Sequence, residues 1–113
     1  MDLVLEIYCI TKKFPKNEVY GLASQMRRAA VSIPSNISEG YKRNHLPEYL
    51  QFLSVANGSG AELETQIELC KRLPELNHLS YTKAEALLEE VMKMFTVLIR
   101  NLTTKRYTLH PKP

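Results

Sequence analysis

The feature that most constrains the fold is an apolar stripe that keeps heptad spacing over three full heptads in the middle of the chain. It runs through Tyr49, Leu53, Ala56, Gly60, Leu63, Ile67 and Cys70, in alternating steps of four and three residues. Such a stripe lies along one face of an α-helix and packs against a neighbouring helix at the ~20° crossing angle of a bundle. The sequence therefore predicts a helix that begins near Asn44–Pro47 and ends before Pro74.

Two stripes near the chain ends predict two more helices. The N-terminal stripe comprises Leu3, Ile7, Ile10 and Phe14. Because proline cannot continue a helix, we expect this helix to stop at Pro15, with Lys12 and Lys13 in its last turn. The C-terminal stripe comprises Ala84, Leu88, Val91, Phe95, Leu98 and Leu102. Ser80 is a favourable N-cap for this helix, which we expect to reach about Lys105.

A fourth stripe, between about Glu18 and Arg43, contains a proline. It comprises Leu22, Met26, Ala29, Ile33 and Ile37. Pro34 removes a helical hydrogen bond and clashes with the preceding turn, at a cost of roughly 3 kcal/mol. Either two helices meet at this point or one helix kinks there, and the unbroken stripe favours the kinked helix. Gly40 is a candidate stop for it.

Four helices with short connections and no predicted strand define an all-α fold. Short connections place consecutive helices side by side and antiparallel. The sequence therefore predicts an up-and-down antiparallel four-helix bundle with a Pro-kinked second helix over residues 1–107, and a flexible tail at 108–113. Gly58 and Gly60 lie inside the heptad-spaced helix, where each costs ~1 kcal/mol relative to alanine. We expect both to permit the close approach of a neighbouring helix.

The composition excludes several other classes of protein. Of the 113 residues, 44% are hydrophobic and 24% are charged, as in globular domains and unlike disordered chains. Apolar runs are too short to span a membrane, because charged residues such as Glu6 interrupt them. Met1 and Asp2 do not form the basic start of a signal peptide, so we expect a cytoplasmic location. Cys9 and Cys70 stand far apart, and we expect buried free thiols instead of a disulfide.

No residue pattern in the sequence predicts catalysis, a metal ion or a cofactor. His45, His78 and His110 are scattered, and none has the i, i+4 partner of a helical zinc site. Di-metal bundles require Glu-x-x-His motifs on two helices, and no such pair occurs here. The glycine-rich loops that bind phosphate are also absent. Arg72 and His78 match the spacing of HEPN-type ribonucleases, but Pro74 interrupts the pair within a predicted loop. We therefore expect a non-enzymatic protein.

Charge is unevenly distributed along the chain. The formal net charge is +3, but residues 1–45 and 80–113 each carry +3, whereas residues 46–79 carry −3. This segregation favours a basic face. The candidate nucleic-acid-binding residues are Lys12, Lys13, Arg27, Arg28, Lys42, Arg43, Lys105 and Arg106. Tyr41 and Tyr107 adjoin two of these groups and are candidates for stacking on bases. The alternative is that the cations are solvated side chains on helix faces and helix ends.

Apolar residues beside the third and fourth stripes point to self-association. They are Phe52, Val55, Leu73, Leu87, Met94 and Ile99. A chain of this size leaves part of such wide stripes exposed, and a homo-oligomer would cover the excess. The alternative is a single core stripe of ordinary width. An oligomer would also bring together basic groups that lie at opposite ends of one subunit.

The stretch RRAAVSIPSNISEGY at residues 27–41 resembles the family of the 23S rRNA intervening-sequence protein. Further matching segments are Ile7-Tyr8, Thr11–Pro15, Tyr20–Leu22, Gln51–Leu53, Gly58-Ser59 and Glu62–Gln66, within about residues 7–73. The resemblance implies a four-helix bundle that assembles as a ring-shaped homopentamer. It also implies kinship with the accessory variability determinant of diversity-generating retroelements, a basic barrel that binds nucleic acid and a reverse transcriptase.

The resemblance also implies roles for individual residues. Arg27 and Arg28 become the first candidates for an electropositive surface. A structural motif supports the proline-containing helix or a subunit contact, and its members are Ser32, Pro34, Ser35, Asn36, Glu39 and Gly40. Two departures from the family stand out. The first helix is short, which would weaken the oligomer, and His45 replaces a serine that often caps the third helix.

Together these patterns predict a non-enzymatic, cytoplasmic, homopentameric four-helix bundle that needs no cofactor. It is expected to bind RNA or DNA through phosphate contacts, without strong sequence preference. The alternative is a protein–protein scaffold, for example for a reverse transcriptase, with no direct role in nucleic-acid binding. An exposed apolar groove would be the signature of that scaffold.

Overall fold

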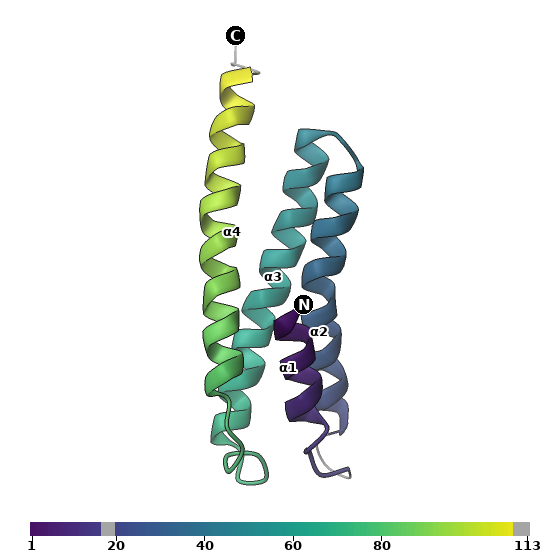
Figure 1. The fold of residues 1–113 in the computed structure, drawn as a ribbon, viewed down its shortest axis with the longest axis vertical. Coiled ribbons are helices and arrows are strands. Elements are labelled where there is room, and N and C mark those ends of the chain that lie inside the picture. Colours follow the sequence, from purple (N-terminus) through teal and green to yellow (C-terminus); the bar gives the residue numbers. More distant parts are fainter. Residues whose placement is uncertain (17–19, 110–113) are drawn as a thin grey trace.

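The computed structural model describes residues 1–16 and 20–109, and every regular element within these ranges is a helix. The helices are α1 (Asp2–Thr11), α2 (Tyr20–Lys42), α3 (Leu46–Arg72) and α4 (Thr82–Leu109). They run alternately down and up the long axis of the molecule (Figure 1). The predicted all-α four-helix bundle is confirmed.

Each helix packs against two neighbours. α1 packs against α2 and α4, and α3 packs against the same two helices. The resulting rod measures 57 × 22 × 20 Å. α1 has only 10 residues, or about 15 Å of helix, and therefore covers only one half of the rod (Figure 1). α4 has 28 residues, and its C-terminal turns extend past the connection between α2 and α3.

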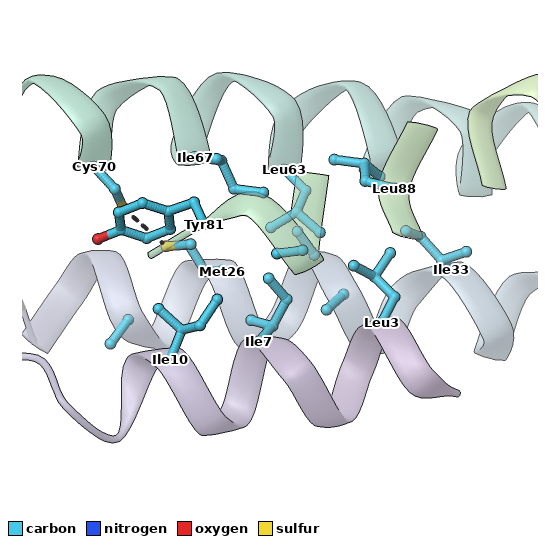
Figure 2. Packing of buried hydrophobic residues seen from close by; sticks show 14 of the residues in the cluster. Leu3, Ile7, Ile10, Met26, Ile33, Leu63, Ile67, Cys70, Tyr81 and Leu88 are labelled. Atoms are coloured by element: carbon cyan, nitrogen blue, oxygen red, sulfur yellow. Dashed lines mark hydrogen bonds between the residues drawn. The ribbon is translucent and has the colours of Figure 1, made fainter. Parts of the chain in front are cut away.

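A single hydrophobic core runs between the helices, and the predicted stripes supply most of it. Figure 2 shows Ile7 of α1 and Met26 of α2 facing Leu63 and Ile67 of α3. Further buried residues of the predicted stripes are Leu3, Ile10, Phe14, Ala29, Ile33, Leu53, Ala56, Cys70, Ala84, Leu88 and Phe95. Full burial of one large aliphatic side chain contributes ~1.5–3 kcal/mol, so these stripes determine which face of each helix turns inward.

Cys70 lies in a small buried cluster with Met26 and Tyr81 (Figure 2). Its thiol donates to the Met26 sulfur at 3.6 Å, and the Tyr81 hydroxyl donates to the carbonyl oxygen of Leu76 at 2.8 Å. Burial raises the pKa of both the Cys70 thiol and the Tyr81 phenol, so both groups remain neutral at pH 7. Both cysteines are free thiols, as predicted, but the expectation that Cys9 is buried is wrong.

α1 ends one turn before Pro15, earlier than predicted. Its last helical residue is Thr11. The backbone N–H groups of Lys13 and Phe14 donate to carbonyl oxygens three residues back, at 3.0 and 3.1 Å, which tightens the chain out of the α-helix. Lys12 and Lys13 therefore follow the helix and do not lie within its last turn.

α4 begins later than predicted, at Thr82. The carbonyl oxygen of Tyr81, and not that of Ser80, accepts the hydrogen bond that starts the helix, at 2.8 Å. The buried Tyr81 side chain is itself bonded to Leu76, which fixes the chain where it enters the helix. The buried side chain of Tyr81 thus sets the start of α4, and a cap at Ser80 does not.

The two remaining boundaries concern segments at the edge of the described residues. α4 continues to Leu109, beyond the expected end near Lys105 and into the expected tail at 108–113. The rest of that tail, residues 110–113, lies outside the described residues. The predicted start of the second helix at Glu18 also lies outside them, and α2 is described from Tyr20.

Pro34 lies inside one continuous helix, so the alternative of two helices meeting there is wrong. Polar side chains bond to the backbone beside it. Asn36 Nδ2 donates to the carbonyl oxygen of Ser32 at 2.7 Å and to its hydroxyl at 2.9 Å. Ser59 of α3 donates to the same hydroxyl at 2.8 Å, so Ser32 links α2 to α3. Ser35, in contrast, is exposed.

Gly40 is a helix-packing position and not a helix stop. It is buried inside α2, and a Cβ atom at this residue would lie 2.6 Å from the Cβ atom of Phe52 on α3. α2 continues to Lys42, and the chain then turns at Asn44, which has a left-handed φ of 52°. The absence of a side chain at Gly40 therefore lets the ends of α2 and α3 approach each other closely.

The two glycines of α3 differ in their surroundings. A Cβ atom at Gly60 would overlap the sulfur atom of Met92 on α4, so the predicted close approach is confirmed there. A Cβ atom at Gly58 would meet nothing within 4 Å, so the same expectation is wrong for Gly58. Gly58 lies in an exposed helix interior, where glycine is unfavourable relative to alanine.

Alanine at Gly40 and alanine at Gly58 should change stability in opposite directions. Gly40→Ala forces the rigid Cβ of Phe52 away and should lower the free energy of unfolding by about 1–3 kcal/mol. Gly58→Ala adds only helix propensity and should raise it by up to ~1 kcal/mol. Urea denaturation of the two variants measures both shifts, and equal shifts would contradict the packing described for Gly40.

Candidate nucleic-acid interface

A groove of about 730 Å³ lies between α1 and α2. Its wall on one side is α1 with the turn that follows it, and its other wall is the N-terminal half of α2. The lining residues are Tyr8, Thr11, Lys12, Phe14, Pro15, Lys16, Tyr20, Ala23, Ser24, Arg27, Arg28, Val31 and Ser32. Four of these are Lys or Arg, and none of the lining residues that the structure describes is acidic. We call this concavity the basic groove.

Three of the four cations in the basic groove are available to a ligand. Lys12, Lys16 and Arg28 are exposed. The ion pairs formed within the described part of the chain involve other residues, so none of these three is neutralised by a described carboxylate. Uncompensated charges of one sign in a concavity add their potentials and attract anions.

Arg27 is held in place at the inner side of the basic groove. Its Nε donates to the Thr11 hydroxyl oxygen at 2.7 Å, and its guanidinium carbon lies 4.7 Å from the centre of the Tyr8 ring. Thr11 is buried and donates in turn to the carbonyl oxygen of Ile7 at 2.6 Å. Of the guanidinium nitrogens of Arg27, only Nε is hydrogen-bonded to a described residue, so the terminal nitrogens keep N–H groups that suit the planar, bidentate geometry of a phosphate.

Two tyrosines stand among these cations. The exposed fraction is 43% for Tyr8 on α1 and 74% for Tyr20 at the start of α2. Exposed aromatic rings beside Lys and Arg occur in proteins that bind single-stranded nucleic acid, where bases stack on the rings. The basic groove therefore combines two kinds of contact, charge for phosphate and aromatic surface for bases.

A second group of predicted cations lies at the opposite end of the rod. Lys42 and Lys105 line a pocket of about 580 Å³ together with Tyr41. This pocket is formed where α2 ends, α3 begins and α4 passes. These candidate cations therefore do not form one continuous patch within a subunit. Lys12, Arg27 and Arg28 come together at one end.

The other predicted residues are placed differently. Lys13 is exposed next to the basic groove and does not line it. Arg43 is engaged within the chain, because it pairs with Glu39 at 3.1 Å and lies 5.3 Å from the centre of the Phe52 ring. The backbone of Arg106 is part of α4, and its side chain lies outside the described ones.

The opposite face of the bundle carries acidic residues. A groove of about 430 Å³ between α3 and α4 is lined by Glu64, Glu68, Glu85 and Glu89, with Lys93 as its cation. Lys71, whose pKa is raised by its hydrogen bond to Glu85, neutralises part of this charge from outside the groove. The lining of the α3–α4 groove is thus net acidic and disfavours a polyanion, in contrast to the basic groove.

No alternative site of catalytic or metal-binding type is visible in the described part of the chain. It contains no cluster of three or more His, Cys, Asp or Glu side chains that could hold a metal ion. Arg72 ends α3 and bonds to Glu68 at 3.1 Å, while His78 is exposed in the following connection. Among the described helices, none has an apolar stretch long enough to cross a membrane.

A small all-helical bundle with a basic groove between its first two helices defines a structural class of protein and not a single activity. The family model of the 23S rRNA-intervening sequence protein matches residues 1–97, and the chain belongs to this family. The match includes most of α4 as well as the segment on which the sequence resemblance rests. No curated protein is similar enough to be identified as a relative.

Sequence reasoning missed Tyr8, Thr11 and Tyr20 as members of the basic groove. Tyr8, Thr11 and Lys12 are spaced to share one side of a helix, and this was the available signal. This spacing does not show whether that side of α1 lies beside α2 or is surrounded by solvent. The packing of α1 against α2 in the structure decides it.

Thr11→Val tests the link between the two walls of the basic groove. The variant keeps the shape of the side chain but removes the acceptor of Arg27 Nε and the side-chain bond to the carbonyl oxygen of Ile7, so the free energy of unfolding should fall by about 1–2 kcal/mol. Thr96→Val, which loses only an exposed bond to the carbonyl of Met92, is the matched control. A thermal or urea unfolding series measures both, and equal losses would contradict the link.

Proposed function

We propose that this protein binds nucleic acid through phosphate contacts in the basic groove. The single observation that carries the proposal is the gathering of Lys12, Lys16, Arg27 and Arg28 in one concavity without a described acidic lining residue. Electrostatic contacts of this kind supply most of the affinity for a polyanion. The acidic lining of the α3–α4 groove would repel a nucleic acid, which supports binding at the basic groove and not on that face.

The proposed binding is non-enzymatic and independent of base sequence. Phosphate contacts set affinity and position but carry no sequence information. The proposal includes no cofactor and a cytoplasmic location, where RNA and DNA are accessible and Cys9 and Cys70 stay reduced.

Removal of two groove cations should weaken binding uniformly across sequences. Neither Lys12 nor Arg28 forms an ion pair with a described carboxylate, and both are exposed. The double variant Lys12→Ala with Arg28→Ala should therefore keep the fold, while its affinity for nucleic acid at low salt falls. The slope of log affinity against log salt should also become shallower by about 1.4–1.8, because two phosphate contacts are lost at ~0.7–0.9 each. Fluorescence-anisotropy titration of labelled RNA and DNA at several salt concentrations measures both quantities.

The matched control removes one lysine and one arginine of α4, neither of which lines the basic groove. Lys93→Ala with Arg100→Ala lowers the net charge by the same amount, and its effect on affinity should be small. If both double variants bind with the affinity of the wild type, the basic groove is not the nucleic-acid interface. If both weaken binding equally, net charge and not the groove determines the affinity.

Exposed apolar side chains favour a second function, protein binding, which includes self-association as a homopentamer. Met94 and Val97 stand on one side of α4, with an exposed fraction of 64% for Met94, and Val55 is exposed on α3. The C-terminal turns of α4 also project beyond the α2–α3 connection (Figure 1). Exposed apolar surface of this kind is typical of interaction sites. The partner in this proposal is a second copy of the chain, or another protein such as a reverse transcriptase.

Met94→Glu should lower the oligomeric state if α4 forms the subunit contact. A homopentamer has five times the 13.0 kDa mass of the chain, and a charge buried at its interface would drive it toward the monomer. Light scattering after size-exclusion chromatography measures the mass, and Thr96→Glu on the exposed surface of the same helix is the control. A wild-type protein that is monomeric would exclude self-association.

A further inference from the structure

We propose that the basic groove accepts a single strand of nucleic acid in preference to a duplex, with a base stacked on Tyr20. This inference rests on the proposed function and makes it more specific. It follows from three features of the groove: its exposed aromatic ring, the depth at which Arg27 lies, and the concave shape between α1 and α2.

The first feature is the ring of Tyr20. Its exposed fraction is 74%, and it lines the same concavity as Lys16 and Arg27. In a duplex the faces of the bases are stacked against each other inside the helix, so an aromatic ring beside the phosphates gains no stacking partner. In a single strand the bases are free to stack on a tyrosine, whatever their identity.

Tyr8 plays a different part. The guanidinium of Arg27 lies 4.7 Å from the centre of the Tyr8 ring, so one face of this ring is already covered. Tyr8 therefore serves mainly to orient Arg27. The planar guanidinium offers a surface on which a base can stack, as well as N–H groups for a phosphate. This leaves Tyr20 as the more accessible stacking position of the two.

The second and third features concern access. Arg27 is half-buried, and its Nε is bonded to the buried hydroxyl of Thr11, so a ligand must enter the basic groove to reach the remaining N–H groups. A duplex is a convex rod that touches the exposed cations at the rim, such as Lys12 and Arg28. A single flexible strand can follow the concave surface and contact rim and floor together.

The test compares three labelled ligands of about 12 units, within the usual site size for single strands: oligo-uridine RNA, oligo-thymidine DNA and a DNA duplex. Anisotropy titrations of the wild type at one low salt concentration should give tighter binding to a single strand than to the duplex. The two single-stranded arms identify whether RNA or DNA is favoured. Circular dichroism confirms the helical fold of every variant.

Variants of Tyr20 then test the stacking contact. Tyr20→Ala should weaken single-strand binding about five-fold or more, the change that corresponds to ~1 kcal/mol of base stacking, and should leave duplex binding unchanged. Tyr20→Phe, which keeps the ring, should bind like the wild type. Tyr41→Ala is the comparison variant, because Tyr41 is the stacking candidate in the other basic pocket and has a similar exposed fraction of 76%. It should weaken single-strand binding less than Tyr20→Ala does.

The outcomes separate this inference from the proposed function. If Lys12→Ala with Arg28→Ala weakens binding but Tyr20→Ala does not, the phosphate-binding groove stands and the stacking contact is overturned. Duplex binding as tight as single-strand binding, or a larger loss in Tyr41→Ala than in Tyr20→Ala, also overturns the inference. If the wild type binds none of the three ligands, the proposed function fails together with it.

Discussion

A ten-residue helix such as α1 is marginal on its own in water, because too few hydrogen bonds offset the cost of nucleating it. α1 is stabilised by one apolar face, with Leu3, Ile7 and Ile10 buried against α2 and its neighbours. The contact of Thr11 with Arg27 then fixes how α1 is placed along α2. The basic groove has α1 as one of its walls, so the candidate site depends on this docking.

The architecture was predictable because apolar periodicity records which face of a helix is buried. The stripe from Leu53 to Cys70 is buried at each of its inner positions, and this alone requires a partner helix. The helix ends were less predictable, because they depend on tertiary contacts. Tyr81 sets the start of α4 through its buried ring and its bond to Leu76, and no local sequence rule distinguishes that arrangement from a cap at Ser80.

Glycine was the least predictable residue type for the same reason. Gly40 suggested a helix stop, yet it lies against Phe52 in the packed interior. Gly58 and Gly60 carry the same helix-propensity cost in the sequence, and only Gly60 faces a neighbouring helix. Propensity describes the residue alone, whereas the space available to a Cβ atom belongs to the assembled bundle.

The candidate site was predictable in its chemistry and not in its grouping. Arg27, Arg28 and Lys12 were identified from the sequence, and the structure places them in one groove. Arg43 was identified by the same reasoning but is engaged with Glu39 and Phe52. The difference lies in which side chains each cation meets on the polar surface of the assembled bundle, and apolar periodicity does not specify these neighbours.

The two-walled construction of the basic groove couples ligand occupancy to the integrity of the fold. A ligand that touches both α1 and α2 binds only the state in which α1 is docked. By mass action the ratio of docked to undocked molecules then rises by the factor 1 + L/Kd, where L is the free ligand concentration. Among the described helices, the shortest one, α1, is then the helix whose docking the ligand stabilises. The groove and the helix that encloses it are thermodynamically one unit, and undocking of α1 removes both together.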